Sequence, residues 1–161
     1  MTIRRAAVVL AAGAILLVPS LAHADITGFL GSLRTTNPQT VSGVAASVTL
    51  IVVGVEFEYA NAPENVSTLT PRLSTGMVSA LVRTPTGKIQ LYGTIGVGVY
   101  REARGIVTNT NTASCIGGGV TIGLAGPLGV RLDYRIIGLR NSINADTSTR
   151  HRIYAGVNLK F

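Results

Sequence analysis

The stretch LGVRLDYRI, at residues 128–136, alternates apolar side chains with glycine or charged residues at every step. Successive side chains of a β-strand point to opposite faces, so this two-residue period predicts a strand with one apolar and one charged face. The same period appears in VGVEFEY at 53–59 and in RIYAGVNLKF at 152–161. A chain made of such strands must give each face its own environment, and few folds satisfy that requirement.

Strand-like stretches bounded by turn residues recur along the chain, and no segment longer than one turn has a helical period. They lie at about 26–35, 41–50, 53–60, 72–83, 88–101, 113–124, 128–139 and 151–161. Their connections alternate in length. PTGK at 85–88 and AGPLG at 125–129 are tight Pro/Gly turns. The longer polar connections are 35–39, 61–71, 102–112 and 140–149. Short turns at one end and long loops at the other are typical of an outer-membrane β-barrel.

The N-terminus has the features of an export signal. MTIRR is positively charged, residues 6–18 form an apolar run of 13 residues, and PSLAHA at 19–24 ends in a small-x-small pattern. An apolar run of this length is too short to span ~30 Å of hydrocarbon as a helix. We therefore predict a secretory signal peptide over 1–24, cleaved after Ala24, and one domain over 25–161.

The content of the two strand faces indicates which one meets lipid. The polar face collects glycine and charges of both signs, as a narrow packed interior requires, whereas ionised residues are absent from the apolar face. An ionised residue facing lipid costs about 2–4 kcal/mol at the bilayer midplane. We predict an all-β fold, an eight-stranded antiparallel up-and-down transmembrane barrel with its apolar face on lipid. A soluble exported barrel with the apolar face inside is the alternative, and strands 26–35, 41–50 and 72–83 are less decisive.

Several segments resemble the strands of a known group. These are GVEFEY, LYGTIGVGVY, CIGGGVTIGL, GVRLDYR and RIYAGVNLKF. They are similar to the small bacterial outer-membrane β-barrel proteins of the OmpA/OmpX-like group. The resemblance implies an eight-stranded barrel in the outer membrane of a Gram-negative-type bacterium. The chain departs from the larger OmpA-type proteins in that we find no periplasmic peptidoglycan-binding domain in its sequence, so an anchoring role is not expected.

The last strand also resembles the signal by which the outer-membrane assembly machinery recognises its clients. The residues that carry this likeness are Tyr154, Val157, Leu159 and the C-terminal Phe161.

The charged residues of the polar face are predicted to meet in the lumen. They are Glu56, Glu58, Arg131, Asp133, Arg135, Arg152 and Lys160. Eight strands enclose an interior just wide enough for side chains to fill. We therefore expect ion pairs that plug the barrel, and a non-enzymatic structural or surface-interaction role. A narrow, porin-like passive pore is the alternative.

A second group of arginines falls near the long-loop end of the strands. It comprises Arg34, Arg72, Arg101, Arg104, Arg140 and Arg150. The guanidinium group offers phosphate a planar fork of donors. One hypothesis is a belt that holds lipopolysaccharide phosphates, and the other is ordinary snorkelling at an interface. The formal net charge of +7 does not indicate a nucleic-acid partner for an exported barrel.

The sequence offers little to a catalytic or metal site. Downstream of the predicted signal the only histidine is His151, with Asp146 and Ser148 nearby in a loop, and Cys115 is the only cysteine. Proximity in a loop does not make a catalytic triad, and one histidine with one cysteine does not make a metal-ligand cluster. We expect no cofactor and no enzyme activity. A lipid-modifying outer-membrane enzyme is the weakest alternative.

Overall fold

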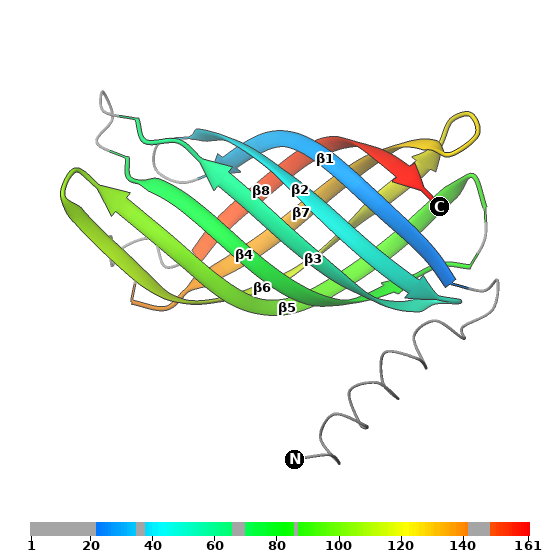
Figure 1. The fold of residues 1–161 in the computed structure, drawn as a ribbon, viewed down its shortest axis with the longest axis horizontal. Helices are drawn as coiled ribbons and strands as arrows, with labels where there is room; N and C mark the ends of the chain where they lie inside the picture. Colours follow the sequence, from blue (N-terminus) through cyan, green and yellow to red (C-terminus); the bar gives the residue numbers. More distant parts are fainter. Residues whose placement is uncertain (1–21, 35–37, 66–69, 86, 142–148) are drawn as a thin grey trace, which may run out of the picture.

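A computed structural model describes residues 22–34, 38–65, 70–85, 87–141 and 149–161. There, one antiparallel sheet closes on itself as an eight-stranded barrel (Figure 1). The strands are β1 (Ala22–Arg34), β2 (Gln39–Leu50), β3 (Val53–Ala62), β4 (Arg72–Arg83), β5 (Ile89–Arg104), β6 (Val107–Gly123), β7 (Leu128–Leu139) and β8 (Thr149–Lys160). The predicted all-β, up-and-down barrel is confirmed. No helix in these ranges is long and apolar enough to cross a membrane.

The barrel closes where the first strand meets the last. β1 pairs with β8 in antiparallel register from Asp25 opposite Lys160 to Arg34 opposite His151. Beyond this ladder, the amide of Phe161 donates to the carbonyl oxygen of Ala24 at 2.8 Å. Closure leaves neither strand with an unpaired edge. The signal peptide stays a prediction, because residues 1–21 lie outside the described part of the chain.

The short turns lie at the same end of the barrel as Phe161. They are 51–52 between β2 and β3, 84–88 between β4 and β5, and 124–127 between β6 and β7. Ile51 lies in the first of these turns with φ of 57°. A β-branched residue rarely adopts this left-handed conformation, so the backbone is strained there.

One predicted loop is a strand pair instead. We expected residues 102–112 to form a polar loop, but β5 and β6 continue through it in register as far as Arg104 opposite Val107. Gly105, with φ of +57°, turns the chain at the tip. The TNTNT run at 108–112 places a β-branched threonine at every second position, which favours a strand over a loop. The hairpin forms the far left end of the molecule in Figure 1.

Candidate functional site

The outer surface of the barrel is apolar over most of its height. On β5 the outward side chains of Ile95 and Val97 are 62% and 67% exposed, whereas inward Thr94 is 5% exposed. Outward apolar positions run from Ile89 to Val99. Ten steps of about 3.3 Å, tilted as barrel strands are, rise about 25 Å, the height of the apolar band of membrane barrels.

Outward apolar side chains of this kind occur on all eight strands. A water-soluble monomer rarely exposes a contiguous apolar patch above a few hundred Å². The charged residues of the polar strand faces, such as Glu56, Arg131 and Arg135, meanwhile lie inside, which is the reverse of the soluble barrel that we had considered. The exterior therefore suits lipid and not water.

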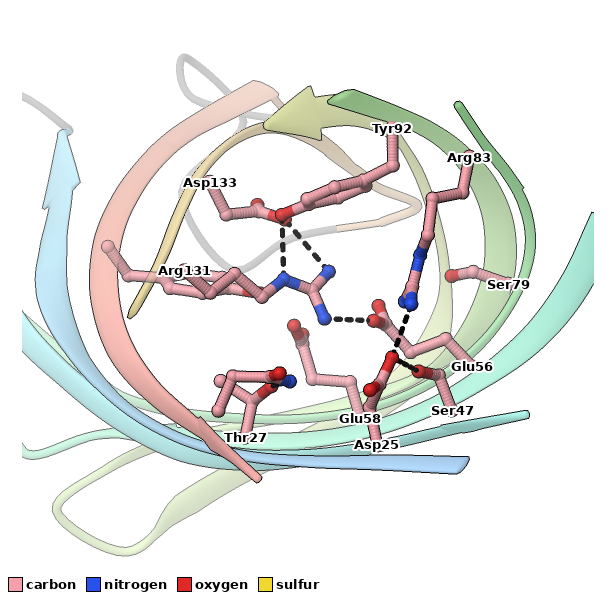
Figure 2. Close-up of polar contacts among 12 residues, drawn as sticks. Asp25, Thr27, Ser47, Glu56, Glu58, Ser79, Arg83, Tyr92, Arg131 and Asp133 are labelled. Carbon is pink, nitrogen blue, oxygen red and sulfur yellow. Dashed lines mark hydrogen bonds and ion pairs between the residues drawn. The ribbon is translucent and has the colours of Figure 1, made fainter. Parts of the chain in front are cut away.

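The middle of the lumen holds an ion-pair network between β3 and β7. Nη1 of Arg131 donates to Oε2 of Glu56 at 2.5 Å, and Nη2 of Arg135 donates to Oε1 of the same carboxylate at 2.5 Å. Nε of Arg135 donates to Oδ1 of Asp133 at 2.9 Å. Figure 2 shows Arg131 reaching across the lumen towards Glu56. One carboxylate thus joins two arginines from the opposite wall.

Glu58 and Arg152 extend this network to β8. Nη2 of Arg152 donates to Oε1 of Glu58 at 2.5 Å, and Nη1 of Arg135 lies 3.2 Å from the other oxygen of Glu58. The three arginines and three carboxylates of the network balance in charge, and all six are buried. Balance is required here because an unpaired buried charge is very costly. We call this set of six residues the lumen cluster.

Aromatic side chains pack against the lumen cluster, and we had not predicted these contacts. Nε of Arg131 donates to the Tyr92 hydroxyl at 2.7 Å, and that hydroxyl donates to Asp133. The Arg131 guanidinium also lies 4.3 Å from the centre of the Tyr92 ring, a cation–π distance. Phe29 stacks on Tyr154 with ring centres 4.0 Å apart. The sequence feature that could have predicted a lumen position for Tyr92 is its place on the polar face of its strand.

A separate ion pair lies nearer the short-turn end. Arg83 Nη1 is 2.5 Å from Oδ2 of Asp25, and the Ser47 hydroxyl donates to the same oxygen at 3.4 Å (Figure 2). We missed this pair because Asp25 lay outside the expected first strand. Lys160 is half-buried at this end, where its Nζ donates to Gln90 at 2.7 Å. No ion pair links it to the lumen cluster among the described residues.

Towards the long-loop end the lumen becomes apolar. Leu33, Leu73, Ile137 and Leu139 are all buried there. Within this apolar layer Nη2 of Arg150 donates to Oε1 of Glu102 at 2.9 Å. The interior thus has a charged layer, where we expected ion pairs, followed by a largely apolar layer that we did not predict.

The predicted arginine belt is partly rearranged. Arg34, Arg72, Arg101 and Arg140 are exposed near the long-loop end. The prediction that Arg150 belongs to this belt is wrong. Its side chain is buried and paired with Glu102, so it faces the lumen and not lipid. Arg104 ends β5, and its side chain lies outside the described part of the chain.

The remaining candidates from the sequence lie apart from the lumen. His151 is exposed, and its Nδ1 shares a hydrogen bond of 2.7 Å with the Tyr134 hydroxyl. Asp146 and Ser148 lie outside the described residues. Among the residues that are described, no group of three potential metal ligands occurs. Cys115 is buried beside Ser79, with Sγ and Oγ 3.6 Å apart.

The residues of the predicted assembly signal do not share one face. Val157, Leu159 and Phe161 point outward on the last strand and beyond it. Tyr154 points inward, where it stacks on Phe29. The outward members alone are available to a partner at the barrel surface.

Comparison with known proteins identifies the fold. The sequence matches no protein-family model and no curated protein. Among solved structures, Neisserial surface protein A has a TM-score of 0.68 at 15% identity, over 88% of this chain and 98% of that one. The N-terminal β-barrel domain of Pseudomonas aeruginosa OprF has 0.63 at 16%, over 86% and 97%. Ail, the attachment invasion locus protein of Yersinia pestis, has 0.54 at 13%, over 87% and 98%. The chain has the fold of the small outer-membrane β-barrels, as the sequence resemblance implied.

Proposed function

We propose that the chain is an integral protein of the bacterial outer membrane, with residues 1–24 removed as a signal peptide. The observation that carries this proposal is the apolar exterior around a charged, closed interior. Cleavage after Ala24 leaves the pairing of β1 with β8 intact from Asp25 onward. The short turns and Phe161 would face the periplasm, and the long connections would face outside.

Its role in this proposal is non-enzymatic, as a structural or surface-interaction protein with a filled lumen. Arg135 is 0% exposed at the centre of the lumen cluster. The groups available to a partner are instead at the long-loop end, where Arg34, Arg72, Arg101 and Arg140 are exposed. Arginines at this height would hold the phosphates of lipopolysaccharide in the outer leaflet.

During biogenesis the partner would be the outer-membrane assembly machinery, which would read the last strand and Phe161. Phe161 is exposed, so removing its ring should not disturb the lumen. We expect Phe161→Ala to lower the amount of barrel in the outer membrane of producing cells, while refolding from urea into lipid proceeds as for the wild type. Equal amounts in the membrane would contradict this role of Phe161.

Membrane insertion is tested by refolding the chain into phospholipid vesicles and running it on a denaturing gel, boiled and unboiled. We expect a change in mobility on boiling, because a closed barrel resists detergent at room temperature. A chain that stays folded and dispersed in buffer without detergent or lipid, with no such change, would contradict the proposal.

A narrow passive pore is the second candidate, favoured by the interior position of Glu56 and its neighbours. The paired charges argue against it, since an ion would have to displace groups that already neutralise one another. In planar bilayers we expect no stable conductance from the wild type. Conductance that changes on Glu56→Gln would establish the pore instead.

Catalysis is tested separately through His151, the histidine that remains once residues 1–24 are removed. We expect outer-membrane lipids extracted from cells that produce the wild type, or its His151→Ala variant, to have identical mass spectra. A lipid modification that disappears in His151→Ala, with the mobility change on boiling retained, would make the protein an enzyme.

A further inference from the structure

A hollow of about 540 Å³ opens on the outer surface over β3, β4 and β5. Its floor follows from the strand register, which places Gly76 between Tyr59 on one side and Val99 on the other. A Cβ atom at Gly76 would meet only Cγ2 of Val99, at 4.0 Å. The missing side chain thus leaves a trough with an apolar floor and two larger side chains as walls.

Polar groups border this trough on the side of the long loops. In the next row of the register Ser74 lies between Asn61 and Arg101, and Arg72 follows one step further along β4. Oδ1 of Asn61 accepts hydrogen bonds from Nε of Arg72 at 3.1 Å and from the Ser74 hydroxyl at 3.0 Å. These bonds hold the Arg72 side chain at the edge of the trough.

Neither arginine at this edge is paired with a carboxylate of the described residues. Within the described ranges, Arg72 and Arg101 have no carboxylate within ion-pair distance. Glu102, which follows Arg101 in the sequence, points into the lumen and binds Arg150. Two cations therefore border an apolar trough at the level where the outward surface changes from apolar to polar.

We propose that this hollow binds one phosphorylated lipid of the outer leaflet, of the lipid A type. Its phosphate would lie between Arg72 and Arg101, and the first part of an acyl chain would lie over Gly76. A free phosphate would leave the apolar floor unused, and an uncharged lipid would leave both guanidinium groups without an anion. This inference rests on the proposed membrane location, and it assigns the general arginine belt one specific site.

The opposite side of the barrel shows why this position is distinct. Arg34, on β1, borders a smaller hollow of about 330 Å³, together with Tyr134, His151 and Ile153. This smaller hollow is bordered by one arginine rather than two, and the nearby Nδ1 of His151 already shares a hydrogen bond with the Tyr134 hydroxyl. We therefore expect Arg34 to contribute little to the retention of a single lipid.

The experiment measures lipid A binding to the protein extracted in detergent from the membranes of producing cells, by native mass spectrometry. The ligands are bisphosphorylated lipid A and its dephosphorylated form. Gly76→Leu fills the trough, and Arg101→Gln removes one cation. The matched controls are Gly28→Leu, at an outward glycine of β1 with no atom within 4 Å of an added Cβ, and Arg34→Gln.

We expect Arg101→Gln to weaken lipid A binding about tenfold, the change that accompanies loss of one charge-assisted interaction. Gly76→Leu should weaken it as well, because the leucine would occupy the space proposed for the acyl chain. Dephosphorylated lipid A should bind the wild type no more tightly than lipid A binds these two variants. Both control variants should bind lipid A like the wild type. Unchanged binding by Gly76→Leu would overturn the trough. An equal loss in Arg34→Gln would overturn the specific site in favour of a diffuse belt.

The mobility change on boiling separates this inference from the proposal on which it depends. If every variant shows the change and all bind lipid A alike, the lipid site is wrong and the membrane barrel stands. If the wild type shows no change and needs no detergent, the membrane location is wrong, and the lipid site is wrong with it.

Discussion

Arg135→Met is expected to destabilise the barrel, because Arg135 is the arginine with the most partners in the lumen cluster. It lies within 3.2 Å of a carboxylate oxygen on each of Glu56, Glu58 and Asp133. Methionine approximates the length of the arginine stem and supplies no charge. The lumen cluster would then hold three carboxylates and only two arginines, with one negative charge uncompensated.

The size of the effect follows from what each carboxylate retains. Glu56 keeps Arg131 at 2.5 Å, and Glu58 keeps Arg152 at 2.5 Å. Removing one partner from a buried ion pair typically costs 3–5 kcal/mol when the other charge is left alone. Asp133 also keeps Arg131, at 3.2 Å. Since all three carboxylates keep an arginine, we expect a loss near the lower end, about 3 kcal/mol of unfolding free energy.

The assay is the urea dependence of the mobility change for chains equilibrated in lipid vesicles. A second variant, Arg135→Met combined with Glu56→Gln, restores charge balance and should recover at least half of the loss. Two results would refute the reasoning. One is a cost below about 1 kcal/mol for Arg135→Met, the level of an exposed pair. The other is a double variant whose loss of unfolding free energy equals the sum of the losses for Arg135→Met alone and Glu56→Gln alone, as for independent sites.

Further substitutions test other parts of the fold with the same urea titration. Val157→Arg should cost about 2–4 kcal/mol on the lipid face, whereas Leu50→Arg, at the short-turn end of β2, should cost about 0–1 kcal/mol; equal costs would contradict the facing. Ile51→Gly should stabilise by about 1 kcal/mol, because it relieves a branched residue at φ of 57°; a loss of stability would show that lipid contacts of Ile51 outweigh the strain. Phe29→Ala should cost about 3 kcal/mol, since the ring stacks on Tyr154 inside the lumen; a cost below about 1 kcal/mol would mean that the stack contributes little.

The sequence predicted the barrel where a strand has strictly different faces. On β7 the charges at Arg131, Asp133 and Arg135 alternate with apolar residues, so the period of two was unambiguous, and the structure places all three in the lumen. On β1 and β4 the period was weak because Leu33 and Leu81 also face inward. Apolar side chains that face the lumen remove the contrast on which the pattern depends.

Two errors had signals in the sequence. Arg150 shares its parity with Arg152, so a continuous strand places both on the lumen side. The alternating threonines of 108–112, preceded by Gly105, indicated a hairpin where we expected a loop. Other features had none. The pairing of Arg83 with Asp25 depends on the three-dimensional closure of the barrel, and so does the hollow above Gly76, which requires the register of three strands.

The proposed membrane location depends most on which face of the strands meets lipid. Because the chain contains no tryptophan, that face can be measured directly. Val97 points outward on β5 and Tyr92 points inward on the same strand. Each is replaced by tryptophan in turn, and the fluorescence is recorded in vesicles with and without brominated acyl chains, which quench an indole on contact. We expect strong quenching for Val97→Trp and none for Tyr92→Trp. Quenching of Tyr92→Trp but not of Val97→Trp, or of neither variant, would contradict the proposed membrane location.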